Sequence, residues 1–211
     1  MGRIVRHGIA IAVAGGCLAA SRLEAQRTTI TITPFVAGYL PTKALGSLDI
    51  PISGITTTVS AKLKNAPAFG GKIGITPSGR FGIEGAYFYS STKSRISLGL
   101  GVRDSDASVQ GGSLKATFRA TDGKTDADVI FSAGLSGTSR SGEVFRQSLA
   151  QDQFDIGGVV GVGLHLALSP QVTFRLDGDV NLYKWNWRGS IPNTSQADVL
   201  LMAGLGLKLG R

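Results

Sequence analysis

Four residues near the C-terminus have the types and spacing that could support catalysis. Asp177 and Asp179 are two positions apart, so a β-strand would place both carboxylates on one face, where they could act as acid and base. Arg175 shares that face and favours charge neutralisation instead. His165 is the only histidine beyond residue 26. Paired with a nearby serine such as Ser132, it leaves a membrane-embedded lipid A hydrolase open as an alternative.

The remaining motifs of enzymes are missing from the sequence. It contains no GxSxG nucleophile elbow, no HExxH helix and no phosphate-binding loop. The glycine-rich run GGVVGVG, residues 157–163, lacks the following helix that a dinucleotide-binding fold requires, and indicates close strand packing. One histidine cannot make a metal site. We therefore predict no enzyme activity, no cofactor and no bound metal.

These residues must be positioned by β-strands, because hydrophobic residues alternate with polar or small ones along most of the chain. Residues 155–183 contain two alternating runs, which residues 169–171 separate. In the second run, the apolar face extends from Val172 to Leu182. Six further runs alternate in the same way. The eight predicted strands cover residues 28–40, 67–76, 81–91, 113–120, 127–137, 156–168, 172–185 and 198–210.

The predicted connections alternate between long and short. Long ones span residues 41–66, 90–112, 138–155 and 186–197, and short ones span 77–80, 121–126 and 169–171. An outer-membrane barrel has this asymmetry, with tight periplasmic turns, long external loops and an even strand number. The sequence therefore predicts an all-β fold, an eight-stranded antiparallel up-and-down transmembrane β-barrel.

The two faces of the predicted strands differ in charge. One is nearly free of charge and suits lipid, and the other should face a lumen just wide enough for side chains to fill it. The predicted lumen charge network is Lys72, Glu84, Lys115, Arg119, Arg175, Asp177, Asp179 and Lys208.

Aromatic residues near the outward ends of the strands predict an interfacial girdle, with ordinary packing inside the barrel as the alternative. They are Tyr87, Tyr89, Tyr183, Trp185 and Trp187.

Residues 1–25 have the pattern of a secretory signal peptide. Arg3 and Arg6 precede a short apolar stretch, and Ala25 offers a small residue for cleavage, which leaves 26–211 as the barrel domain. The apolar stretch is too short to span a bilayer as a helix. Removal of residues 1–25 lowers the net charge from +8 to +6, because three arginines and one glutamate are lost. The remaining charges are scattered, which argues against nucleic-acid binding.

Four segments resemble the bacterial outer-membrane β-barrel family of small OmpA-like and OmpX-like domains. They are ITPFVAGYLPT (32–42), FGGKIGITPSGRFGIEGAYFYS (69–90), AGLSGTSRSGEVF (133–145) and GGVVGVGLHLALSPQVTFRLDGDVNLY (157–183). The resemblance implies a protein of the bacterial outer membrane, folded by the outer-membrane assembly machinery. Such barrels commonly end in an aromatic residue, whereas this chain ends Leu209-Gly210-Arg211.

The function expected from these observations is structural or surface-interactive, with a lumen filled by side chains. The expected partners are outer-membrane lipid, lipopolysaccharide and the assembly machinery, and the barrel is expected to be a monomer. A narrow channel stays open as a second alternative to the lipid A hydrolase.

Cleavage after Ala25 makes Gln26 the first residue of the mature protein. Intact-mass measurement of protein purified from membranes should give the unmodified mass of residues 26–211. A diacylglyceryl group on Cys17 would contradict this expectation and identify a lipoprotein instead.

Overall fold

The computed structural model describes residues 28–42, 46–52, 55–77, 79–98, 101–121, 126–142, 154–185 and 194–209. These form ten strands: β1 (Thr29–Pro41), β2 (Gly46–Ile52), β3 (Ile55–Leu63), β4 (Ala66–Thr76), β5 (Phe81–Leu98), β6 (Gly101–Arg119), β7 (Ala127–Gly142), β8 (Phe154–Ala167), β9 (Val172–Trp185) and β10 (Thr194–Leu209). Within this part of the chain, no helix is long and apolar enough to cross a bilayer. Residues 1–25, and with them the predicted signal peptide, lie outside it.

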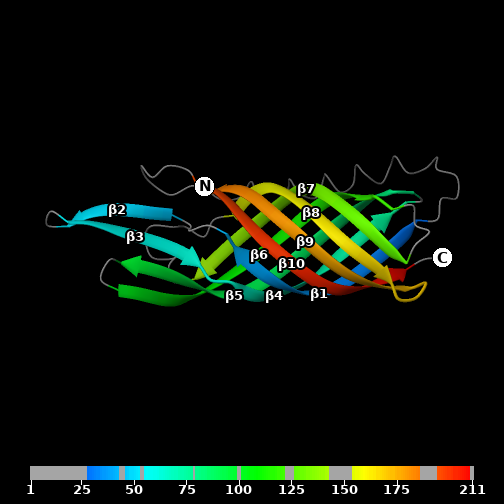
Figure 1. Cartoon of the computed structure of the whole chain (residues 1–211), viewed down its shortest axis with the longest axis horizontal. Coiled ribbons are helices and arrows are strands. Elements are labelled where there is room, and N and C mark those ends of the chain that lie inside the picture. The colour runs from blue at the N-terminus through cyan, green and yellow to red at the C-terminus, as the bar shows by residue number, and fades with distance from the viewer. Residues whose placement is uncertain are drawn as a thin grey trace, which may run out of the picture.

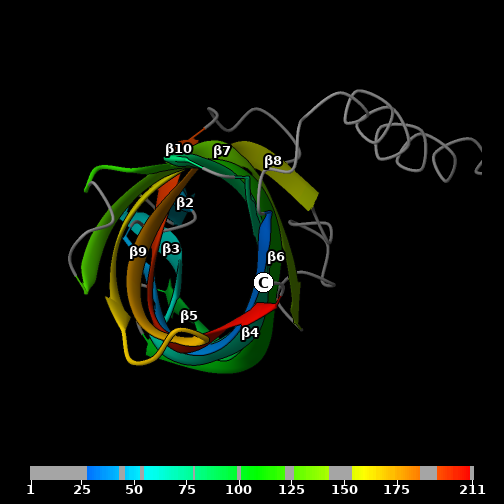
Figure 2. The same cartoon turned by 90° about the vertical axis from the view of Figure 1, so that its right-hand side faces the viewer.

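Eight of the strands close into a barrel. All neighbours are antiparallel, in the order β4-β1-β10-β9-β8-β7-β6-β5, and β5 pairs in turn with both β4 and β6. The ring is visible along the barrel axis in Figure 2. The predicted all-β, eight-stranded antiparallel barrel is thus confirmed.

The two ends of the barrel differ in their connections. At one end, Ile30 of β1 pairs with Leu209 of β10, so the first and last strands begin and finish together. The three short connections lie at this end, which we call the inner end. In the turn between β4 and β5, Gly79 has a φ of 130°, a conformation that glycine adopts without steric strain. We call the opposite end the outer end.

Two predicted loops at the outer end are strands instead. Segment 41–66 contains the β2–β3 hairpin, and segment 90–112 is mostly the continuation of β5 and β6. The hairpin pairs with β5 and projects beyond the ring with the ends of β5 and β6 (Figure 1). The sequence predicted strands only where one face of the segment is apolar. In this extension, polar contacts between neighbouring strands take the place of an apolar face. Arg95 and Lys64 both donate hydrogen bonds to Asp104, which lower the pKa of that carboxyl to about 2.

The ring has a reversed distribution of polarity. Large apolar side chains cover its outside, such as Ile73, Leu135 and Leu201, each more than half exposed. Charged side chains such as Lys72, Glu84 and Lys115 are at most 4% exposed and lie inside. A protein surrounded by water would bury the first set and expose the second. The outside of the ring is therefore suited to lipid.

The aromatic residues are distributed differently from the predicted girdle. Tyr87 and Tyr89 do lie on the outside towards the outer end, where Tyr89 contacts Phe69. The prediction for Tyr183 was wrong. Its side chain is 6% exposed and points into the lumen, where the hydroxyl donates a hydrogen bond to Asp198. Trp185 ends β9, but its side chain and all of Trp187 lie outside the described residues. The sequence reading missed a second outside row near the inner end, formed by Phe81, Phe118 and Phe131.

Substitution of Leu176 by arginine tests the lipid-facing side. Leu176 is outward and 44% exposed near the middle of β9. A cation at this depth should lower the free energy of unfolding in a bilayer by about 2–4 kcal/mol. Urea titration of the refolded protein in lipid vesicles measures the change.

A fluorescence measurement separates lipid contact from burial in a protein core. In a background with Trp185 and Trp187 changed to Phe, brominated acyl chains should quench Leu176→Trp strongly. Lys184→Trp, exposed on the same strand beyond Leu182, should be quenched weakly. Equal quenching at the two positions would contradict the placement of Leu176 deeper in the lipid than Lys184.

Candidate functional site

A cluster of six charged side chains fills the middle of the lumen. Lys72 of β4 lies 2.8 Å from Asp177 of β9, Lys115 of β6 lies 2.6 Å from Asp179, and Arg175 of β9 lies 2.6 Å from Glu84 of β5. Further contacts link these pairs, since Glu84 also lies 3.6 Å from Lys72 and 3.3 Å from Lys115. Three cations face three anions, so the buried cluster is neutral.

The other predicted network residues lie towards the inner end. Arg119 is paired separately, 3.4 Å from Asp128, and Lys208 forms no ion pair with another described residue. His165, considered above as a catalytic residue, places its Nε2 atom 3.0 Å from Oδ1 of Asp177 and extends the cluster. The structure therefore brings together six of the eight predicted charges and separates Arg119 and Lys208 from them.

Two glycines of β8 make room for this cluster. A Cβ atom at Gly161 would overlap Oδ1 of Asp179, and one at Gly163 would overlap Oδ1 of Asp177. The run 157–163 was interpreted as close strand packing. At these two inward positions, the absent side chain instead accommodates a carboxylate.

An apolar layer adjoins the cluster on its outer side. The Lys72 ammonium lies 5.7 Å from the centre of the Phe35 ring, and Phe88 stacks on Tyr39 with centroids 6.1 Å apart. Met202 and Val109 are buried in the same layer. The sequence predicted a lumen charge network but not this layer, which makes part of the lumen a small hydrophobic core.

A second buried ionic cluster follows towards the outer end, and the sequence reading missed it. Arg140 lies 2.7 Å from Asp155 and 3.3 Å from Asp198, with its guanidinium over the Tyr183 ring. The hydroxyls of Tyr39 and Tyr183 donate to the same oxygen of Asp198. Arg140 and Asp155 fell in the predicted loop 138–155, where no inward face was expected. The alternation of β7 beyond residue 137 was the available signal.

The dyad considered for a lipid A hydrolase is not formed. In the register of β7 and β8, His165 pairs with Asp128 and Ser132 pairs with Gly161. Four strand positions separate the two pairs, which is about 13 Å along the backbone at 3.3 Å per residue. The side chains of Ser132 and His165 are too short to bridge this separation with a hydrogen bond. Among the described residues, no group of three His, Cys, Asp or Glu side chains is arranged to hold a metal ion.

Comparison with known proteins identifies the fold. No family model matches the chain, and no curated protein matches it. Among solved structures, OprG from Pseudomonas aeruginosa is 16% identical, with a TM-score of 0.66 over 88% of this chain and 98% of its own. The outer membrane protein AlkL, solved in lipid bilayers, is 14% identical with a TM-score of 0.55 over 88% and 92%. Ail of Yersinia pestis, solved with the heparin analogue sucrose octasulfate, is 14% identical with a TM-score of 0.51 over 87% and 99%.

The fold is that of the small outer-membrane β-barrels. At these identities the likeness concerns the fold alone. It agrees with the closed ring, the apolar outside and the strand lengths, since each ring strand has at least 11 residues and a tilted membrane strand needs about 9–11.

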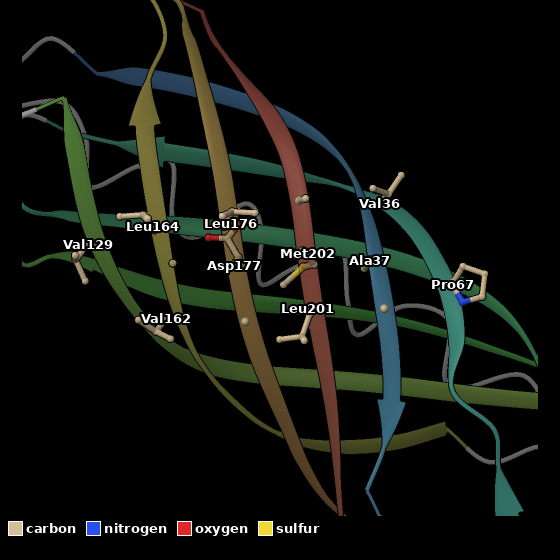
Figure 3. A pocket seen from close by; sticks show the side chains of 14 residues that line it. Val36, Ala37, Pro67, Val129, Val162, Leu164, Leu176, Asp177, Leu201 and Met202 are labelled. Carbon is tan, nitrogen blue, oxygen red and sulfur yellow. The ribbon is translucent and has the colours of Figure 1, made fainter.

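The barrel has a hollow in its outside wall. Its volume is about 890 Å³, and Figure 3 shows side chains of β1, β8, β9 and β10 around it, including Val36, Leu164, Leu176 and Leu201. Gly38 and Gly178 also line it. The lining is mostly apolar, although Asp177 and Met202 reach it from the lumen side, so lipid acyl chains suit this hollow better than a polar substrate does.

Removal of one anion from the central cluster should destabilise the barrel strongly. Glu84→Gln leaves three buried cations with two carboxylates, and breaking a buried pair costs about 3–5 kcal/mol of folding stability. Urea titration in vesicles measures the loss. As a matched control, Asp104→Asn removes a solvent-exposed carboxylate from the β5–β6 extension and should lower the midpoint far less, because exposed ion pairs contribute little. Equal midpoints for the wild type and Glu84→Gln would contradict the cluster.

Proposed function

We propose that this protein resides in the bacterial outer membrane as a closed, non-catalytic barrel with a structural or surface-interaction role. The observation that carries the proposal is the filled lumen, in which two buried ionic clusters and an apolar layer are stacked between the ends. A transport protein needs a continuous path, and a hydrolase needs a nucleophile beside its base. In the described residues, Ser132 and His165 do not meet.

The outer end supplies the surface for interaction. Beyond Tyr89, the outward side of β5 carries Lys93 and Arg95, and Lys62 of β3 is the register partner of Arg95. Lys62 and Lys93 are exposed and form no ion pair with another described residue. These lysines lie next to the outward Tyr87 and Tyr89. Their position suits contact with the phosphates of lipopolysaccharide, since ammonium groups bind phosphate as point charges. The Ail complex with sucrose octasulfate supports polyanion binding by a barrel of this fold.

The remaining partners follow from this setting. Membrane lipid would cover the apolar outside, and insertion of a closed ring would require the outer-membrane assembly machinery. We propose a monomer, because the ring leaves no unpaired strand edge at membrane depth that a second copy would cover.

Planar-bilayer recording tests the closed lumen against the narrow-channel alternative. The purified barrel should show no steady conductance, because the paired charges of the lumen, with 1–9% of each side chain exposed, leave no water-filled path. Reproducible single-channel steps from the wild type would establish an open path and refute the proposal.

Binding of lipopolysaccharide tests the proposed surface. The double variant Lys62→Gln/Lys93→Gln should bind lipopolysaccharide micelles several-fold more weakly than the wild type, with the difference shrinking at high salt. Lys184→Gln, which removes an exposed lysine from β9, is the control and should bind as the wild type does. If the double variant and the control bind alike, the β3–β5 surface is not the contact site.

A further inference from the structure

A small polar cavity lies inside the inner end of the lumen. Its volume is about 90 Å³, and all eight ring strands contribute to its lining. Glu84 and Arg175 of the central cluster line it, together with Arg119, Asp128 and Lys208. It lies apart from the outer-end surface to which the proposed function assigns the partner.

The carboxylates around this cavity already have partners. Asp128 accepts a hydrogen bond from the Thr121 hydroxyl and lies 3.4 Å from Arg119. Glu84 contacts Arg175 and two lysines. His165 also lines the cavity, with its Nε2 atom against Asp177. The anionic groups of the wall are therefore neutralised within the wall.

Several donors around the cavity are not matched in this way. Thr173 is 7% exposed, and its Oγ1 atom has no hydrogen-bond partner in the described part of the chain; the same holds for Nε of Arg175, which is 6% exposed. The Lys208 ammonium has no ion-pair partner there either. A buried donor without a partner costs about 1–3 kcal/mol, so the Thr173 hydroxyl and the Arg175 Nε–H require an acceptor, whereas Lys208 is only partly buried.

The three donors come from two neighbouring strands, β9 and β10. Thr173 and Arg175 share the inward face of β9, and Thr173 pairs in register with Gly206 of β10, two positions before Lys208. A Cβ atom at Gly206 would lie 3.1 Å from Thr31, 3.2 Å from Thr33 and 3.4 Å from Cδ of Arg175. Because Gly206 has no side chain, room is left beside the aliphatic part of Arg175.

We propose that this cavity binds one small inorganic anion, held by the Lys208 ammonium, the Arg175 Nε–H and the Thr173 hydroxyl. The net charge of the donors selects an anion over a cation or a neutral molecule. The cavity volume of about 90 Å³ favours a small ligand. Chloride, phosphate and sulfate are small inorganic anions of the kind proposed.

Nuclear magnetic resonance of the full mature chain in detergent micelles tests the site directly. The ¹⁵N-labelled protein is titrated separately with chloride, phosphate and sulfate, while gluconate, a larger organic anion, keeps the ionic strength constant. At least one of the three anions should move the Arg175 Nε–H and Thr173 amide signals along a saturable curve. Amide signals of the β5–β6 extension should stay in place.

Variants distinguish binding of the anion at this site from general effects of salt on the protein. Lys208→Met should weaken binding at least tenfold, and Thr173→Val should weaken it several-fold through loss of one donor. Lys93→Met removes a lysine at the outer end and should bind as the wild type does; dispersed amide spectra report that each variant is folded. The proposal is wrong if none of the three anions gives saturable shifts, which would mean that water satisfies the donors. It is equally wrong if folded Lys208→Met or Thr173→Val binds the anion unchanged.

Discussion

Closure of the β-sheet is the constraint on which the rest of this structure depends. A wall that faces lipid has no water to satisfy its backbone N–H and C=O groups, so every strand needs a neighbour on both sides. Pairing of β5 with β6, from Phe81–Phe118 to Leu98–Gly101, completes the ring. Eight strands enclose a space that side chains alone can fill. The contents of the lumen therefore have to satisfy one another, as the residues of a soluble core do.

The central cluster shows how charged residues meet that requirement. Its shortest pairs cross between strands that are distant in the sequence, as Lys72 and Asp177 do over 105 positions. Buried ion pairs add little net stability compared with apolar packing, but an unpaired buried charge costs several kcal/mol. A slip of one residue in any of these strands would also turn its charges towards lipid. The cluster therefore specifies the register of the ring more than it stabilises the ring.

The sequence predicted the repeated parts of the fold well, because alternation with a period of two is a local property. The ring strands, their faces and the short turns follow from it. It could not predict which charges pair, since Lys115 meets Asp179 only through ring closure. Strand length at the outer end was missed where polar cross-strand contacts, such as Arg95 with Asp104, replace an apolar face. Tyr183 was misplaced because an aromatic residue near a strand end suits a membrane interface or a buried hydrogen bond equally well.

The two faces of one strand also differ in how strictly their surroundings limit which residues fit. On β8, Val160 and Val162 are about half exposed on the outward face, and lipid there would conform to any apolar shape, so hydrophobicity alone is required of them. The inward Gly161 and Gly163 meet the fixed carboxylates of Asp179 and Asp177, where even one added carbon would overlap an oxygen. Polarity selects the outward residues and volume selects the inward ones. In this barrel, some of the 30 glycines are therefore the spatial complement of its buried charges, and a glycine-rich strand can be among its most constrained elements.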